Sequence, residues 1–175
     1  MACSGDDIRK KPCDLDGIEQ YPFMKGMLSD TSYSVKITPN ILSHAGIDES
    51  RAWEKAIENL CADTQITSLT KLLSDMSGIP IDASAEPDIN LHVVTNSEKY
   101  KGAAAIMNRK ALRRFAREHH TNILFVLPSS IHEMMNSPFT EKTTEDELSA
   151  IVREFNETQV APEERQTDRA YILCL

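Results

Sequence analysis

Residues 89–136 read INLHVVTNSEKYKGAAAIMNRKALRRFAREHHTNILFVLPSSIHEMMN, and in this stretch strand-like apolar runs lie on either side of a strongly amphipathic helix. Within it, Ile123–Leu127 is an unbroken apolar run that ends at Pro128. Such a run is typical of a strand buried on both faces, because a strand with one solvated face alternates apolar and polar residues. We therefore expect this run at the centre of a sheet.

The helix predicted over 109–119 follows Asn108, which suits an N-cap, and it has two distinct faces. At 100° per residue, Leu112 and Phe115 fall on an apolar side. Before this helix, the alternation in 89–95 predicts a strand with one apolar face. Residues 103–107 are interpreted as its hairpin partner, whereas propensity alone would make them the start of a helix running to His120.

Local patterns predict further elements on both sides of this stretch. Tyr33–Ile37 alternates and favours a strand, and Thr38, Pro39 and Gly46 mark the cap, first position and end of a helix over 39–45. Apolar residues at three- and four-residue steps predict three more helices, at 49–62, at about 66–76 and at 144–157. Further strands are expected near 131–136 and at 170–174, and a loop at 79–88.

Together these elements predict an α+β fold, with a mixed or antiparallel sheet of about five to six short strands and about three to five helices packed on it. A chain of 175 residues suits one domain. We expect a poorly ordered N-terminal arm over 1–30, because that segment has no sustained apolar period, and a single α+β domain over 31–175.

Composition favours a cytoplasmic protein. No stretch approaches the roughly 20 apolar residues that cross a bilayer, and the N-terminal residues lack an apolar core followed by a small-residue cleavage site. The four cysteines are scattered without a Cys-x-x-Cys pair, so we expect free thiols, no metal and no cofactor. His119 and His120 suit the end of a helix better than a metal site.

Basic residues are segregated in this acidic chain, whose formal net charge is −8. Between Lys99 and Arg117 there are seven Lys or Arg and no acid, whereas 141–169 holds nine acids and four bases. The pattern predicts either a solvated face paired with the acidic last helix, of the same chain or of a neighbouring copy, or a site for an anionic partner. The candidate binding residues are Arg109, Lys110, Arg113, Arg114 and Arg117.

A second candidate site is formed by Ser129, Ser130 and His132. Together with Glu133 they supply the residue types needed for a nucleophile, a base and an orienting carboxylate. However, adjacent residues on a strand point to opposite faces, so His132 and Glu133 cannot pair, and no Gly-x-Ser-x-Gly elbow is present. We therefore expect a structural role, in which a serine hydroxyl bonds local backbone and no acid orients His132.

The block GAAAIMNRKALRRFAREHHTNILFVLPSSIHE, followed by ELSAIVREFNETQVAPEE and a last strand after Asp168, resembles an uncharacterised family of cytosolic proteins from Gram-positive, largely gut-dwelling bacteria. The resemblance covers roughly Tyr33 to Tyr171. The last third is also similar to a second uncharacterised family from related bacteria. Neither resemblance implies an activity, a cofactor or a catalytic residue.

The function that the sequence favours is a non-enzymatic protein-interaction or regulatory module. Such a module does not depend on a catalytic set of residues that the chain lacks. We expect its partner to be a protein with an acidic surface, or a second copy of the chain, and we expect no membrane association. One alternative is a small hydrolase or transferase centred on Ser129, Ser130 and His132. Another is a weak nucleic-acid binder through the helix at 109–117. No catalytic motif is complete, so the sequence favours a protein that is not an enzyme, without deciding the question.

Overall fold

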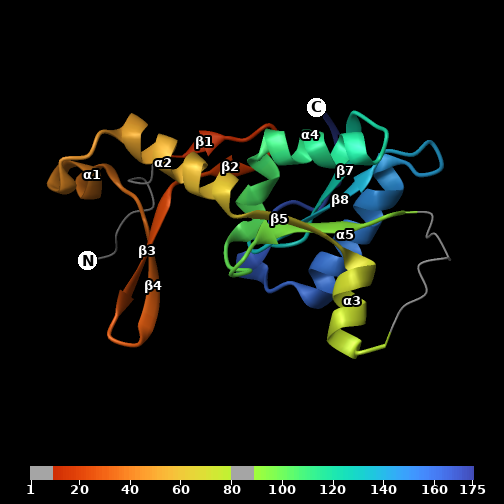
Figure 1. Ribbon diagram of the computed structural model, residues 1–175, viewed down its shortest axis with the longest axis horizontal. Helices are drawn as coiled ribbons and strands as arrows, with labels where there is room; N and C mark the ends of the chain where they lie inside the picture. Colours follow the sequence, from red (N-terminus) through yellow and green to blue (C-terminus); the bar gives the residue numbers. More distant parts are fainter. Residues whose placement is uncertain (1–9, 80–88) are drawn as a thin grey trace. The chain divides into compact units, whose positions relative to one another are not determined.

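The computed structural model describes residues 10–79 and 89–175, and the chain divides into two compact units, Met1–Asn59 and Leu60–Leu175 (Figure 1). The sequence places a boundary after residue 30 instead, and that domain boundary stays a prediction. The loop expected at 79–88 lies outside the described residues except for Ile79. No helix among the described residues has the length and apolar character needed to span a membrane.

The first unit contains two small antiparallel sheets, each of two strands. Its elements are β1 (Lys11–Pro12), β2 (Glu19–Gln20), β3 (Phe23–Leu28), β4 (Thr31–Lys36), α1 (Pro39–Ala45) and the first turns of α2 (Glu49–Ala62). The segment expected to be a poorly ordered arm therefore carries β1, β2 and β3 over its described part, residues 10–30.

Helix α1 begins and ends where local sequence signals predict. Thr38 Oγ1 accepts a hydrogen bond from the Ile41 amide at 3.3 Å, and Gly46 ends α1 with φ of 63°. Glycine suits that position because a left-handed backbone is costly for residues with a Cβ. In α2, Trp53 is buried, and the Lys11 ammonium lies 4.2 Å from the centre of its ring.

The second unit contains a five-stranded sheet in which every neighbouring pair is antiparallel. In spatial order its strands are β5 (Thr64–Ser68), β6 (His92–Asn96), β8 (Met134–Pro138), β7 (Ile123–Pro128) and β9 (Tyr171–Cys174). Its other elements are α3 (Leu69–Ser77), the 3-10 helix η2 (Gly102–Met107), α4 (Arg109–Glu118), α5 (Glu145–Gln159) and the 3-10 helix η3 (Pro162–Glu164). The predicted α+β class with an antiparallel sheet is confirmed.

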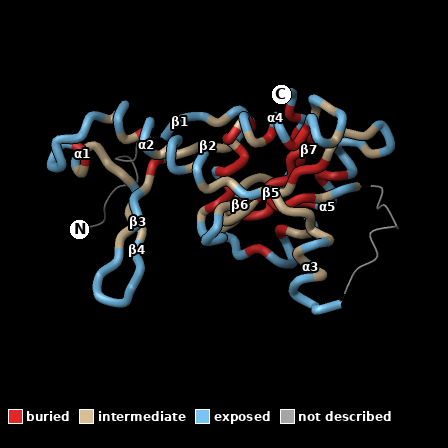
Figure 2. Tube along the Cα trace, viewed as in Figure 1, coloured by how far each residue is buried: buried red, intermediate tan, exposed pale blue. Residues whose placement is uncertain are grey.

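Strand β7 is buried from Leu124 to Pro128, as its apolar run predicts, although β8 rather than β7 occupies the middle of the sheet. The buried segments in Figure 2 are concentrated in this sheet and in the parts of the helices that face it. Strand β6 is also buried on both faces from His92 to Thr95, so the expectation of a single apolar face there is wrong.

Helices α4 and α5 cover opposite faces of the sheet (Figure 1). Residues directly opposite one another in an antiparallel pair share a face. The row of His92, Asn136, Val126 and Tyr171 faces α4, because the Phe115 ring lies 4.7 Å from the His92 ring.

The alternate residues of β7 face α5 instead. Phe125 and Leu127 pack with Leu148 and Val152 of that helix. Apolar periodicity predicts one core shared by six residues: Leu112, Phe115, Phe125, Leu127, Ile151 and Phe155. This prediction is wrong, because successive strand residues point to opposite faces and the sheet separates two apolar layers. The same periodicity places Ile151 on the buried side of α5, but its side chain is 44% exposed.

Three local assignments also differ from the prediction. Residues 103–107 form η2 rather than a hairpin strand, as local propensity favours. Gly102 at the start of η2 lies so close to its neighbours that an added Cβ would be 2.7 Å from the backbone of both Asn96 and His132. The helix expected from residue 66 begins at Leu69, since 64–68 pair with β6 as β5. Strand β8 begins at Met134 rather than near 131.

Candidate functional site

The first candidate site is the basic face, defined as Arg109, Lys110, Arg113, Arg114 and Arg117 of α4. Two features fix the helix that carries it. Asn108 caps the helix, since its Oδ1 accepts from the Ala111 amide at 3.1 Å while its Nδ2 donates to the Cys61 carbonyl at 3.4 Å. Leu112 and Ala116 are almost completely buried against the sheet. The opposite side of α4 must therefore point outward.

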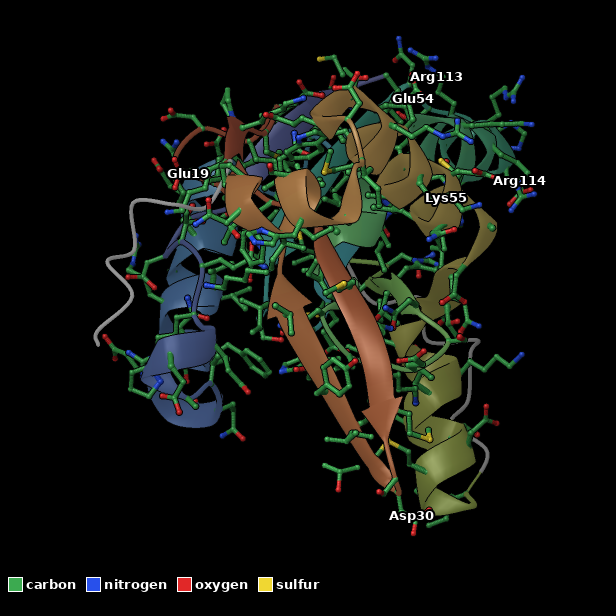
Figure 3. The ribbon with its side chains drawn as sticks, turned by 90° about the vertical axis from the view of Figure 1, so that its left-hand side faces the viewer. Glu19, Asp30, Glu54, Lys55, Arg113 and Arg114 are labelled. Atoms are coloured by element: carbon green, nitrogen blue, oxygen red, sulfur yellow. The ribbon has the colours of Figure 1, made fainter. Side chains whose placement is uncertain are left out.

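The basic face is largely exposed. Lys110, Arg113, Arg114 and Arg117 are exposed and Arg109 is half-buried. Figure 3 shows Arg113 and Arg114 extending away from the ribbon.

Few contacts restrain these side chains. Arg114 Nε lies 4.0 Å from Glu118 Oε1, and Arg117 Nε donates to the Arg113 carbonyl at 3.2 Å. An exposed ion pair of that length contributes little stability, typically below about 1 kcal/mol. Among the described residues, Lys110 and Arg113 form no ion pair.

The acidic residues of α5 lie across the sheet from the basic face. Those of its first turn, Glu145, Asp146 and Glu147, are all exposed, and Glu147 completes a capping box with Thr144. Because the sheet separates the two helices, α5 cannot cover the basic face of its own chain, and in the described part of the chain no ion pair joins them. The two segregated charge clusters therefore face different directions within this unit.

The second candidate site, around His132, is a hydrogen-bonded turn. The Lys101 amide donates to His132 Nδ1 at 3.2 Å, so Nε2 carries the proton and donates to Glu164 Oε1 at 3.1 Å. The expectation that no acid orients His132 is wrong. The sequence offered no signal for this pair, because Glu164 lies 32 residues away and is brought back by α5 and η3.

The Ser130 hydroxyl bonds the backbone of this turn. Ser130 Oγ accepts from the His132 amide at 3.0 Å, as expected for a structural hydroxyl, and the Gln166 side chain donates to the Ser130 carbonyl at 2.6 Å. Because both imidazole nitrogens of His132 already have partners, neither can accept a proton from Ser129 or Ser130 in this arrangement. The residues are together, but they are not arranged as a nucleophile and its base.

Sequence reasoning did not find a third cluster, which lies between α4 and the sheet. The His92 ring is 5.2 Å from that of His119, and burial lowers the pKa of His92, an effect opposed by its contact with the Asn90 carbonyl. Beside it Asn136 is fully buried, and its side-chain amide has no hydrogen-bond partner among the described residues. In that same part of the chain, no three His, Cys, Asp or Glu side chains are grouped to hold a metal ion.

Comparison with known proteins gives a family but no characterised relative. No curated protein and no solved structure matches the chain significantly. The family described as "Family of unknown function (DUF5688)" matches residues 21–174. That range runs from the residues just before β3 into β9, and it encloses the stretch 33–171 that carried the resemblance to an uncharacterised family. The chain therefore belongs to the DUF5688 family of unknown function.

Proposed function

We propose that this protein is a non-enzymatic interaction or regulatory module of the cytoplasm, which binds an acidic protein surface through the basic face of α4. The observation that carries the proposal is the exposure of Lys110, Arg113, Arg114 and Arg117 on a helix whose other side is buried. A helix held by its core contacts presents its charges at fixed spacing, so less ordering is required when a partner binds.

The electrostatics favour a protein over a nucleic acid as the partner. A local positive face on a chain with net charge −8 orients and accelerates the approach of an acidic patch, whereas the overall charge repels a long polyanion. Aromatic side chains that could stack on bases are scarce here. Phe115 is buried, which leaves Tyr100 as the exposed Phe, Tyr or Trp residue closest in sequence to α4.

The test compares two double variants with matched charge changes. Arg113→Glu/Arg117→Glu reverses two charges on the basic face, and Lys142→Glu/Arg153→Glu reverses two exposed charges elsewhere in the same unit. Each tagged protein is used to capture partners from the native cytosol, with quantitative mass spectrometry as the readout. We expect partners that the wild type and the Lys142/Arg153 variant both retain and that the Arg113/Arg117 variant loses. An identical set from all three would contradict the proposal.

Binding to a nucleic-acid duplex distinguishes the nucleic-acid alternative from the proposed binding of an acidic protein. If the basic face contacts phosphates, the logarithm of the affinity for an arbitrary duplex falls with the logarithm of salt concentration, with a slope of about −0.9 per phosphate neutralised. We expect weak binding of the wild type even at low salt. Strong duplex binding that the Arg113→Glu/Arg117→Glu variant loses would favour the nucleic-acid function instead.

The Glu164 contact with His132 is the one observation that favours the hydrolase or transferase alternative, because an acid–histidine pair is part of many catalytic sites. The engagement of both imidazole nitrogens supports a structural role instead. We expect Ser129 and Ser130 to remain unlabelled by serine-directed activity probes. Covalent labelling that His132→Ala abolishes would support the enzymatic alternative.

A further inference from the structure

Strand β9 forms one edge of the five-stranded sheet, and among residues 10–79 and 89–175 no strand pairs with its outer side. The Leu175 amide donates to the Asn122 carbonyl at 3.0 Å, which makes this a hydrogen-bonded pair in the register of β7 with β9. Hydrogen-bonded and non-hydrogen-bonded pairs alternate along an antiparallel ladder. Leu173 therefore bonds toward β7, whereas the N–H and C=O groups of Ile172 and Cys174 point away from it.

No other described strand pairs with this side of β9. The side chains of Ile172 and Cys174 are exposed, and Ile172 is 45% exposed. Proteins commonly protect such an edge with a charged residue, a proline, a bulge or a very short strand, because unpaired backbone groups recruit another strand. Strand β9 is short, but Tyr171–Cys174 contains no charged residue and no proline, and its register with β7 has no bulge. The opposite edge, β5, is mostly polar, with sequence TQITS.

We propose that β9 pairs antiparallel with β9 of a second copy of this chain, so that two five-stranded sheets join into one. The register that uses both outward residues of each strand places Ile172 opposite Cys174 of the second copy, and Cys174 opposite its Ile172. Each of these two pairs can exchange both N–H···O bonds. Leu173 then lies opposite its own counterpart at the twofold axis.

This register is self-complementary in its side chains as well as in its hydrogen bonds. Ile172 and Cys174 of the second copy share one face of the joined sheet, and the two Leu173 side chains share the other. Every cross-strand pair is apolar and none is charged. An isologous contact of this kind closes on itself as a dimer, which selects a second copy over an unrelated extended peptide.

The short strand limits the strength of the contact, so the dimer is reversible rather than obligate. A twofold axis between antiparallel strands is perpendicular to the sheet, so both copies present α4 on the same side. If the proposed function holds, the dimer offers two basic faces to one acidic partner and gains avidity from them. The pairing of β9 does not itself depend on that function.

The first test is sedimentation of the full chain over a range of concentrations, with reductant present so that Cys174 stays a free thiol. The variant Ile172→Lys places a charge on the pairing edge. Its matched control is Ile151→Lys, since Ile151 of α5 is 44% exposed and the substitution is the same. We expect the wild type and Ile151→Lys to approach twice the chain mass, and Ile172→Lys to dimerise at least about tenfold more weakly.

A wild type that stays monomeric throughout would overturn the proposal, as would equal dimerisation of Ile172→Lys. The second test needs no variant. Hydrogen exchange is measured amide by amide at concentrations below and above the dimer transition. The amides of Ile172 and Cys174 should exchange at least about tenfold more slowly in the dimer, whereas the Leu173 amide is protected at both concentrations. Rapid exchange of Ile172 and Cys174 at every concentration would refute the pairing.

Discussion

Replacement of Phe115 by alanine tests both the phase of α4 and the separation of the two apolar layers. Phe115 is 6% exposed, and its ring contacts the rings of His92 and His119 with centroids 4.7 and 4.4 Å away. Because these contacts all lie on the α4 side of the sheet, the substitution should open a cavity there and leave the α5 side intact.

The expected cost follows from the buried area. An aromatic side chain buries about 150–250 Å², which at about 25 cal/mol per Å² corresponds to about 4–6 kcal/mol. This is an upper estimate, because the unfolded chain already shields part of the ring and alanine retains part of the contact. Phe115→Ala should therefore lower the free energy of unfolding by about 3–5 kcal/mol. Arg114→Ala, at an exposed position of the same helix, should change it by less than about 0.5 kcal/mol.

The measurement is urea unfolding followed by far-ultraviolet circular dichroism, together with hydrogen exchange of the β7 amides. The single tryptophan, Trp53, lies in the unit Met1–Asn59, so its fluorescence is a poor reporter of this substitution. Hydrogen exchange of β7 reports on the affected unit directly.

A double-mutant cycle tests the separation of the layers. Phe115→Ala combined with Phe125→Ala should be additive within about 0.5 kcal/mol, because the two rings lie on opposite faces of the sheet. Phe115→Ala combined with His92→Ala should show a coupling of about 0.5–1.5 kcal/mol, as expected for rings in contact. A loss below about 1 kcal/mol for Phe115→Ala alone, or strong coupling to Phe125, would refute this description of the core.

Two further predictions follow from other buried positions. Gly102→Ala should lower the free energy of unfolding by about 1–3 kcal/mol or more, because the new Cβ would meet the backbone of Asn96 and His132, which cannot rotate away. The measurement is chemical unfolding, and an unchanged denaturant midpoint would contradict the close approach. Burial lowers the pKa of His92, so the unfolded chain binds a proton at this imidazole more readily than the folded chain does. The stability linked to His92 is therefore fully present above the unfolded pKa of about 6.5. It is lost as the pH falls from that value toward the lower folded pKa. His92→Gln should therefore reduce the loss of stability on acidification, whereas His120→Gln, at an exposed position, should not; equal pH dependence in both variants would show that His92 is not responsible.

The sequence alone determined the elements whose ends depend on local backbone chemistry. Thr38 and Gly46 set the ends of α1, Asn108 begins α4, and Thr144 begins α5, because capping bonds and the left-handed conformation involve residues only a few positions apart. The exposure of the basic side of α4 also follows from its apolar period. The apolar run of β7 predicted burial on both faces for a similar reason.

The tertiary structure decided everything that depends on which segments meet. Periodicity marks the buried side of α4 and of α5 but contains nothing about which face of the sheet each helix covers, so the two apolar layers appeared as one. The Glu164 carboxylate reaches His132 only because α5 and η3 return the chain to that turn. In the same way the hairpin strand expected at 103–107 is absent: the segment forms η2, as local propensity favours, and Gly102 at its start lies close to the Asn96 backbone of β6. The order of the strands left β9 at an edge, and a strand's place in a sheet is fixed by partners distant in sequence rather than by its own residues.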